Sequence, residues 1–210
     1  MFYDRYEAGR DVAEMLVQYK GTDAVICAIP RGGILTGVAV AKQLELPLEI
    51  MLVSSSEHPS AENSLYCIVT EYGTQVCGSD DELPESQVQQ AVATAKKKRL
   101  DYTDSETLPD WKNKTVLVVD DGAESGLTIK AVVEALKQQK PKKIVVALPA
   151  ASGSVTQWLE EQVDEGVVLD IEPEFTGVIQ DHYSHYPEVS DKEVHVAYWH
   201  AKHMYEHKQK

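Results

Sequence analysis

The sequence predicts an α/β fold with three layers, in which helices cover both faces of a mainly parallel, twisted sheet. Short runs of β-branched and apolar residues alternate with amphipathic helical segments along most of the chain. Two of these runs, residues 24–29 and 115–119, each lead through a glycine-containing loop into a helix, as in a parallel βαβ unit. At 210 residues, the chain is predicted to form a single domain, residues 1–210.

The first quarter of the chain contains two helices and two strands. Residues 4–19 are predicted to form an amphipathic helix, and residues 24–29 a strand buried on both faces. A helix of small residues follows over 34–44, and the next strand covers 46–53. Because a helix joins the two buried strands, we expect them to lie parallel in one sheet.

Residues 54–80 interrupt this alternation and are predicted to form a flexible hairpin insertion. Residues 54–59 have a loop-like composition. Segments 65–69 and 74–77 flank Glu71-Tyr72-Gly73 in a pattern typical of a β-hairpin.

The second half of the chain returns to alternating helices and strands. A helix that begins at Leu83 ends in the basic run 96–99, which we interpret as a solvated helix end because cations suit that terminus. Residues 172–210 are expected to form a C-terminal tail or hood, whose final helix starts with a capping box at 189–194. The other predicted elements are strands at 115–119, 143–148 and 166–171, and helices at 129–136 and 154–162.

The residues that follow the strand at 115–119 are of types that often bind ligands. Asp120 and Asp121 come directly after it, and a loop rich in small residues then leads into a helix. Backbone N–H groups and hydroxyls at a helix N-terminus favour an anion. A ligand with a phosphate at one end and hydroxyl groups nearby, such as a sugar phosphate, fits both halves of this stretch. The loop residues are Gly122, Ala123, Glu124, Ser125, Gly126, Leu127 and Thr128.

This stretch resembles the phosphoribosyl-pyrophosphate (PRPP) motif of the type I phosphoribosyltransferases, a hydrophobic strand followed by D-D-G-x-x-[ST]-G-x-T. The resemblance implies that Asp120 and Asp121 bind the ribose 2′- and 3′-hydroxyls. It also implies that residues 122–128, with the hydroxyls of Ser125 and Thr128, bind the 5′-phosphate. We expect the carboxylate of Glu124 to point away from the phosphate, since the variable positions of the motif usually contribute only backbone.

A second resemblance lies in Pro30-Arg31-Gly32-Gly33, after the strand at 24–29. In this family a loop at that position binds the pyrophosphate of PRPP, and one branch has L-P-R-G-G there, which the chain matches except for Ile29. Arg31 offers a planar cation, and glycines allow close backbone approach. A tight turn with an exposed arginine is the alternative. The tail resembles the same branch at 174–183 and 189–194, whereas 54–115 matches poorly.

The resemblance implies transfer of a phosphoribosyl group to a nitrogenous acceptor with release of pyrophosphate. Asp120, Asp121 and Arg31 would be the catalytic residues, Mg²⁺ would be held mainly by substrate oxygens, and a homodimer is common in the family. Close family members carry a basic pair where this chain has Ser54-Ser55. Loss of stabilising cations slows a reaction that develops negative charge. A PRPP- or nucleotide-binding regulatory protein with weakened catalysis is therefore the alternative.

Composition restricts the other function classes. The formal net charge of −14 argues against a nucleic-acid partner. It also repels polyanionic PRPP, so binding must depend on local donors and Mg²⁺. No apolar run is long enough to cross a bilayer, and the N-terminus lacks a signal-peptide pattern, so a cytoplasmic protein is expected. Three cysteines without CxxC spacing, Cys27, Cys67 and Cys77, are expected to be reduced.

Other sites are less well supported by the sequence. A response-regulator receiver domain would need an aspartate at the end of a later strand, where this chain has Ala147-Leu148-Pro149. A dinucleotide site would need a GxGxxG after a strand, and the sequence has none. His200, His203 and His207 share one face of the last predicted helix and could bind a transition metal, but a solvated face is the favoured interpretation.

Overall fold

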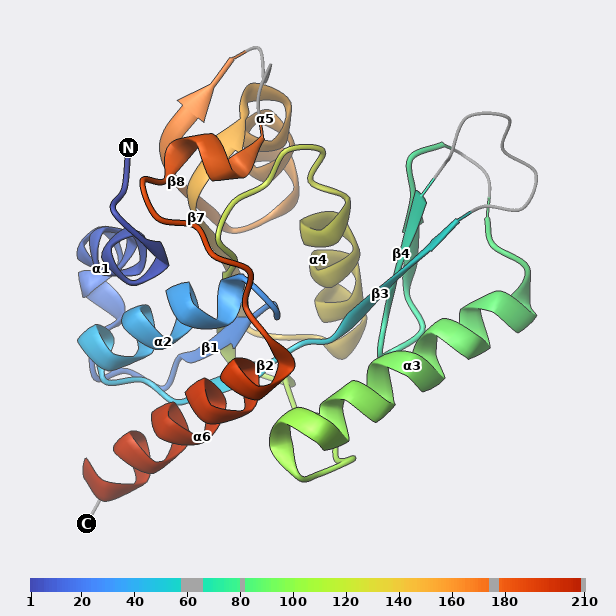
Figure 1. Ribbon diagram of the computed structural model, residues 1–210, viewed down its shortest axis with the longest axis horizontal. Helices are drawn as coiled ribbons and strands as arrows, with labels where there is room; N and C mark the ends of the chain where they lie inside the picture. The colour runs from blue at the N-terminus through green and yellow to red at the C-terminus, as the bar shows by residue number, and fades with distance from the viewer. Residues whose placement is uncertain (58–65, 80–81, 174–177, 209–210) are drawn as a thin grey trace.

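The computed structural model describes residues 1–57, 66–79, 82–173 and 178–208. A five-stranded parallel sheet with helices on both faces forms the larger part, and a three-stranded antiparallel sheet projects from one side of it (Figure 1). The predicted fold class is therefore confirmed.

The parallel sheet has the strand order β2-β1-β6-β7-β8. Its central strand, β6, extends over the predicted residues, and all five of its side chains are buried. Strand β7 is longer than predicted because its last residues pair with the end of β8. The strands are β1 (Val25–Ala28), β2 (Leu48–Ile50), β6 (Thr115–Val119), β7 (Lys143–Ser152) and β8 (Glu165–Glu172).

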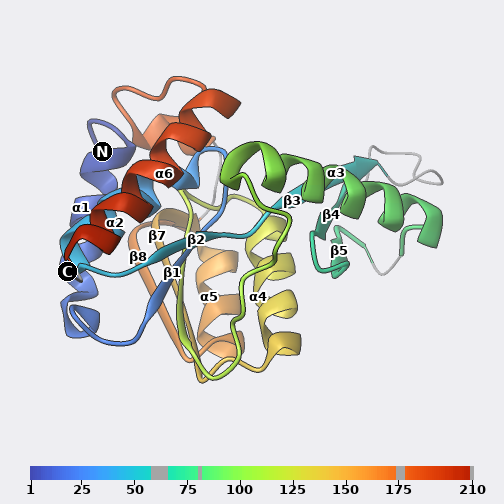
Figure 2. The ribbon, with the colours of Figure 1, turned by 90° about the horizontal axis from the view of Figure 1, so that it is seen from below.

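Helices cover the two faces of this sheet, as Figure 2 shows from below. Alternate side chains of each strand point to opposite faces, so Ile26 packs in one core cluster and Cys27 in the other. One face carries α1 (Arg5–Met15), α2 (Gly33–Leu44) and α6 (Asp191–Lys208), and the other carries α4 (Leu127–Gln139) and α5 (Gly153–Gln162). Two short 3₁₀ helices are η1 (Val17–Tyr19) and η2 (Ile179–His182).

The antiparallel sheet contains β3 (Val53–Glu57), β4 (Tyr66–Thr70) and β5 (Gln75–Cys77), and α3 (Glu85–Thr103) packs beside it. The predicted hairpin around residues 71–73 is present as β4 and β5. The predicted single strand at 46–53 is wrong, because β2 ends at Ile50 and the chain then leaves the parallel sheet to start β3. Residues 54–57 were expected to be loop but pair with β4. Residues 58–65 lie outside the described part of the chain.

A buried ion pair joins the two parts of the molecule. Arg99 Nε lies 2.5 Å from Glu71 Oε2, and its Nη2 donates to the carbonyl of Ile50 at the end of β2. Arg99 was expected at a solvated helix end, and that prediction is wrong, because α3 continues to Thr103 and buries this side chain. The neighbouring Lys96 and Lys97 are exposed. A run of basic residues in the sequence does not show which of them is solvated and which pairs with a carboxylate from another part of the chain, as Arg99 does with Glu71.

The expectation of three reduced cysteines is wrong for two of them. Cys67 and Cys77 face each other across β4 and β5 and form a disulfide. Cys27 is a free, buried thiol in β1, and burial raises its pKa. Pairing across two strands places cysteines opposite each other at any sequence spacing that the turn allows, so the missing CxxC motif carried no information.

The other local predictions agree closely with the structure. The first helix ends at Met15 and continues as η1, rather than running to residue 19. Ser190 and Glu193 form the predicted capping box at the start of α6. Residues 174–177, part of the predicted tail motif, lie outside the described residues. None of the described helices is both long enough and apolar enough to span a bilayer.

Candidate functional site

The two loops singled out by the sequence lie side by side. Strands β1 and β6 are parallel neighbours, with Ala28 opposite Val119, so their carboxyl ends lie at the same edge of the sheet. Residues 30–33 leave β1 there, and Asp120 and Asp121 leave β6 there. Ligands of open parallel sheets bind at this edge. The Pro30–Arg31 peptide bond in the first loop is cis.

Gly32 and Gly33 contact the acidic pair directly. A Cβ atom on Gly32 would lie 1.9 Å from Asp121 Oδ2, and one on Gly33 would lie 2.4 Å from Asp120 Oδ1. Neither glycine has a positive φ. Space, and not backbone conformation, therefore requires glycine at both positions.

Asp121 is held by side chains from both ends of the chain. Arg5 Nε donates to its Oδ2 at 2.6 Å, and the Tyr186 hydroxyl donates to the same oxygen at 2.8 Å. The guanidinium of Arg5 also stacks 3.5 Å from the ring centre of Tyr186. The hydroxyl of Tyr183 donates to the backbone carbonyl of Asp121 at 2.6 Å. Burial, followed by the charge of Asp121, raises the pKa of both tyrosines, which therefore stay protonated as donors.

Asp120 has a different environment. Its Oδ1 accepts the backbone N–H of Asp121 at 2.9 Å, and its side chain lines a cavity beside the loop. Burial, followed by the negative charge of Asp121, raises the pKa of Asp120 well above its usual range. Asp120 Oδ2 has no hydrogen-bond partner among the described residues. One oxygen of each aspartate is thus occupied, and the other is available to a ligand.

The loop at 122–128 encloses a cavity of about 210 Å³. Gly122 and Gly126 adopt φ values of 152° and 71°, which favour glycine. The loop is anchored at Ala123, whose N–H donates to the carbonyl of Ala150. In contrast, the backbone N–H groups of Glu124, Ser125, Gly126 and Thr128 have no acceptor within the described residues. Backbone amides that converge at the start of α4 without partners can bind an anion.

Glu124 lies at the edge of this cavity and is exposed. Its Oε1 accepts the backbone N–H of Ile179 at 2.8 Å, at the start of η2. Its backbone carbonyl accepts the hydroxyl of Ser152 at 2.8 Å. The carboxylate is therefore directed to η2, and the open amides beside it are not used by this side chain.

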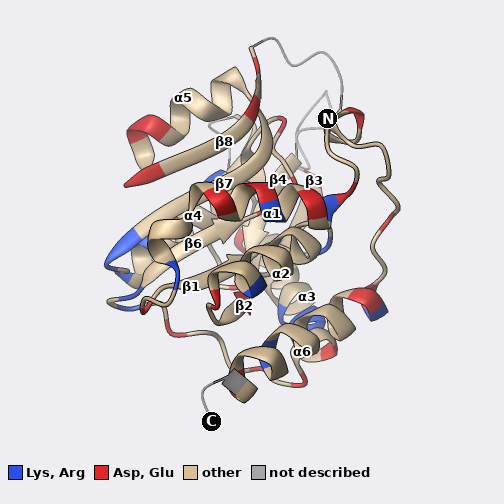
Figure 3. Cartoon of the chain, turned by 90° about the vertical axis from the view of Figure 1, so that its left-hand side faces the viewer, with Lys and Arg blue, Asp and Glu red and all other residues tan. Residues whose placement is uncertain are grey.

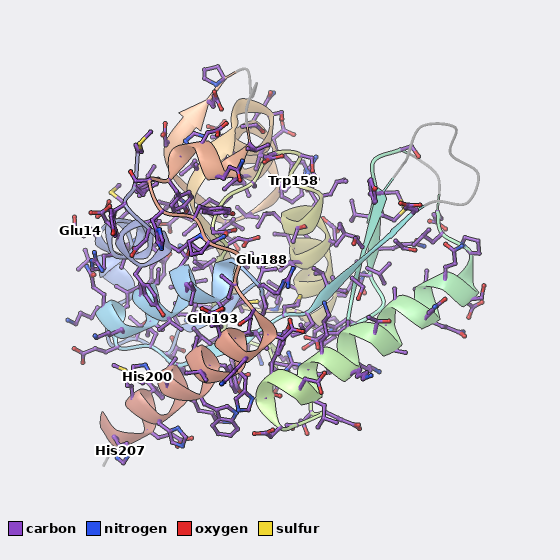
Figure 4. All side chains as sticks on the ribbon, in the orientation of Figure 1. Glu14, Trp158, Glu188, Glu193, His200 and His207 are labelled. Atoms are coloured by element: carbon purple, nitrogen blue, oxygen red, sulfur yellow. A yellow bond between two sulfur atoms is a disulfide. The ribbon has the colours of Figure 1, made fainter. Side chains whose placement is uncertain are left out.

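Arg31 is exposed and forms an ion pair with Glu188, with Nη2 and Oε1 2.8 Å apart. Glu188 belongs to residues 183–190, the segment that runs from η2 to α6 and that Figure 4 shows passing the start of α2. The same segment supplies Tyr183 and Tyr186 to Asp121. We call residues 183–190 the C-terminal strap.

Metal-binding clusters of three or more His, Cys, Asp or Glu side chains do not occur among the described residues. His200, His203 and His207 are exposed along α6, and His203 Nδ1 lies 2.9 Å from the carbonyl of Trp199 in the same helix. Figure 4 shows His200 and His207 at separate points along that helix. Among the described residues, these histidines form no hydrogen bond or ion pair with the acidic pair.

The comparison with protein families decides what this fold and loop arrangement represent. The model of the phosphoribosyl transferase domain matches residues 2–181. The chain belongs to the phosphoribosyl transferase domain family. Both loops described above lie inside the matched range.

Relatives of this phosphoribosyl transferase domain agree with that assignment. A Mycobacterium tuberculosis protein classed provisionally as a phosphoribosyl transferase, Rv0571c, is 27% identical over 206 residues, and its counterpart in a second strain, MT0597, matches equally. The match covers 92% of this chain but only 45% of those relatives, so the chain spans about half their length. The crystal structure of TT1426 from Thermus thermophilus is 26% identical, covers 95% of this chain and 98% of that chain, and superposes with a TM-score of 0.81.

Sequence reasoning missed the residues that hold Asp121. Arg5 lies 116 positions from Asp121 in the sequence, inside a helix whose apolar stripe was its only evident feature. Tyr186 lies between two segments that resembled the family and belongs to neither. What marks Arg5 in the structure is that its side chain is buried, and no pattern in the sequence indicates this.

Proposed function

We propose that this phosphoribosyl transferase domain binds PRPP at the carboxyl edge of β1 and β6. It transfers the 5-phosphoribosyl group to a nitrogenous acceptor and releases pyrophosphate. One observation carries the proposal: the open backbone amides of residues 124, 125, 126 and 128 lie beside two carboxylates that each keep one free oxygen. That pairing of donors and acceptors matches a phosphate joined to a polyhydroxylated ring.

The 5′-phosphate would occupy the cavity enclosed by residues 122–128. Amides of Glu124, Ser125, Gly126 and Thr128 would donate to its oxygens, and the N-terminus of α4 would add a favourable dipole. The hydroxyls of Ser125 and Thr128 lie in the same loop and can also donate. Local donors thus offset the unfavourable field of a chain with a net charge of −14.

The ribose hydroxyls would hydrogen-bond to the free oxygens of the acidic pair. Arg5 and Tyr186 occupy Asp121 Oδ2, which leaves Oδ1 for a hydroxyl. Asp120 Oδ2, which has no partner among the described residues, can accept a hydrogen bond from the other hydroxyl. The close contact of Gly32 and Gly33 with the pair limits its movement. Fixed acceptors of this kind contribute to catalysis by positioning the sugar.

Pyrophosphate would bind at residues 30–33. The N–H groups of Gly32 and Gly33 have no acceptor among the described residues, and no side chain caps the helix that begins there. Arg31 would exchange the carboxylate of Glu188 for the leaving group. In the reaction, the acceptor nitrogen forms a bond to C1 of the sugar while the bond from C1 to the pyrophosphate oxygen breaks, and the electron pair leaves with pyrophosphate.

The donor set fits Mg²⁺ bound mainly through substrate. Two neighbouring carboxylates supply oxygen ligands, and the described residues hold no third acid or histidine beside them. Mg²⁺ is commonly bound by one or two carboxylates together with substrate phosphates and water. When bound, the ion neutralises charge on the departing pyrophosphate. Asp120 and Asp121 would hold it, directly or through water.

Calorimetry tests the proposal. Wild-type protein should bind PRPP in the presence of Mg²⁺, and Asp121→Asn should weaken binding by at least about tenfold, because the variant loses the charged acceptor beside Arg5. Asp23→Asn, an exposed aspartate before β1, is the matched control and should bind as the wild type does. Unchanged affinity in Asp121→Asn would exclude this site.

Turnover then separates an enzyme from a binding protein. The protein is incubated with PRPP and, in turn, with each of a panel of purine, pyrimidine and simpler nitrogenous acceptors. Pyrophosphate should be released only when the correct acceptor is present. Tight binding of PRPP without release for any acceptor would instead assign a regulatory role. That outcome would agree with Ser54-Ser55, which lie in β3 in place of the basic pair that the family resemblance led us to expect.

A further inference from the structure

A large groove lies away from the proposed PRPP site, between α1, α2 and α6. Its volume is about 840 Å³, which is within the range of small-molecule pockets. Helices α1 and α6 each pack on α2, so α2 forms the floor and the other two form the walls. Figure 3 shows the three helices on one face of the molecule.

The floor of the groove is apolar. Leu35, Val38 and Ala39 come from α2, and Ala197 and Val196 come from α6. Val196 is 56% exposed although its neighbours on α6 pack in the core. On α1, Tyr6 is 40% exposed and adds an aromatic surface to the wall. Exposed apolar area of this kind, enclosed by polar residues, marks a binding surface.

The rim of the groove is basic, in contrast to the acidic chain as a whole. Arg10, Lys42 and Lys192 come from the three different helices, and none forms an ion pair within the described residues. The acidic group of the groove is Glu193, whose Oε2 already accepts the N–H and hydroxyl of Ser190 as the cap of α6. Three cations therefore surround an apolar floor with a single carboxylate to offset them.

We propose that this groove binds an amphipathic anion, a small molecule with an apolar or aromatic body and a carboxylate or phosphate group. The body would lie on the α2 floor, and the anionic group would pair with Lys42, Lys192 or Arg10. An acyl carboxylate and a nucleotide both have this chemistry.

A second copy of the chain fits the groove less well. In a two-fold symmetric dimer, the same surface meets itself. Arg10, Lys42 and Lys192 would then approach their own counterparts, and like charges at an interface oppose association. A small anion brings the opposite charge without a second set of cations.

Fluorescence titration with 8-anilinonaphthalene-1-sulfonate, an aromatic anion, tests the proposal. The folded wild type should bind the dye. Lys42→Glu/Lys192→Glu should weaken binding by at least about tenfold, because two attractive charges become repulsive. Lys96→Glu/Lys97→Glu, which changes two exposed lysines of α3 by the same net charge, should retain affinity within about twofold. Circular dichroism verifies that both variants are folded.

A neutral analogue of the dye separates charge from apolar contact. N-phenyl-1-naphthylamine should bind the wild type and Lys42→Glu/Lys192→Glu with similar affinity, since the floor is intact in both. Displacement of the anionic dye by sodium decanoate would identify an acyl carboxylate, and displacement by AMP would identify a nucleotide. Ribose 5-phosphate should displace nothing, because the loop at 122–128 proposed to bind its phosphate shares no residue with the groove.

Several outcomes would overturn the proposal. One is an equal loss of dye affinity in Lys42→Glu/Lys192→Glu and in the control Lys96→Glu/Lys97→Glu, which would mean that the groove lysines have no special role. Displacement of the dye by ribose 5-phosphate would place the dye in the loop at 122–128. If neither decanoate nor AMP displaces the dye, the groove binds the dye but not the proposed class of ligand. A wild-type dimer that binds no dye, and that Val196→Arg converts to a monomer in light scattering, would assign the groove to a second copy of the chain.

Discussion

The two strand–loop–helix units, β1 to α2 and β6 to α4, use glycine for different physical reasons. In the first loop, Gly32 and Gly33 have ordinary φ values, but a side chain at either position would collide with an aspartate of the second loop. In the second loop, Gly122 and Gly126 have positive φ values, and a side chain there would also meet Ile179 or Val155. The first pair of glycines is required by space alone, whereas the second pair also adopts a backbone conformation that residues with side chains rarely adopt.

The helices that follow these two loops begin without a side-chain cap. Side chains of Asp4 and Ser152 cap α1 and α5, whereas α2 and α4 have glycine at the N-cap and no side-chain cap. Uncapped amides are usually unfavourable unless water or a ligand satisfies them. Both loops that resembled ligand-binding motifs thus leave helix amides free, as a shared role in binding requires, although α3, which follows Pro84, also lacks a side-chain cap.

The contact between the loops provides the test with the largest expected effect. Gly32→Ala should destabilise the protein by about 1–3 kcal/mol, because its Cβ would meet a carboxylate that Arg5 and Tyr186 hold in place. In an Asp121→Ala background the same substitution should cost less than about 0.5 kcal/mol, because the colliding atoms are gone. Urea unfolding of the four proteins measures both values. Equal cost in the two backgrounds would mean that space is not the reason for glycine.

The corresponding change in the second loop should behave differently. Gly126→Ala places a side chain at φ 71° and close to Val155 Cγ2. Removal of that contact by Val155→Ala should leave a cost of about 1 kcal/mol, because the left-handed backbone remains unfavourable for alanine. The same urea unfolding cycle measures it. Full relief by Val155→Ala would show that the two loops do not differ in this respect.

Asp120 provides a test that depends on pH. Its raised pKa means that the folded state favours the protonated acid, so its contribution to stability is complete below the unfolded pKa of about 3.9 and is lost as pH rises through the folded pKa. Asp120→Asn keeps the acceptor for the Asp121 N–H and removes the buried charge. The variant should therefore be more stable than the wild type by about 1 kcal/mol at pH 8.

That advantage should decrease toward pH 4, where the wild-type carboxyl is protonated. Urea unfolding at several pH values measures the difference, and Asp23→Asn is the exposed control. A variant that is less stable at pH 8 would show that the ionised carboxylate, and not the acid, is the favoured form.

The smallest expected effect concerns Arg31. Glu188→Gln removes the carboxylate that pairs with Arg31 on the protein surface. Exposed ion pairs contribute about 0–1 kcal/mol, so pyrophosphate should bind at most about fivefold more tightly. Calorimetry with pyrophosphate and Mg²⁺ measures the change, and Glu161→Gln on α5 is an exposed control. Weaker binding would mean that the strap carboxylate supports the ligand instead of competing with it.

The sequence by itself determined the parallel sheet and the place of its two loops. Apolar runs at 25–28 and 115–119 and the glycines that follow them are local patterns, and parallel strands bring their carboxyl ends together without further information. The hairpin at β4 and β5 and the cap of α6 were predictable for the same reason, since each depends on residues close in the sequence.

Only the tertiary structure decided which side chains complete the site. Arg5 reaches Asp121 across 116 positions, and Arg99 reaches Glu71 across 28, and neither pairing leaves a periodic or compositional trace. The Cys67–Cys77 bond likewise depends on register between strands. Buried charges need partners, and a folded chain supplies them from whichever elements packing brings close. Those partners are a property of the packed molecule and cannot be inferred from neighbouring residues.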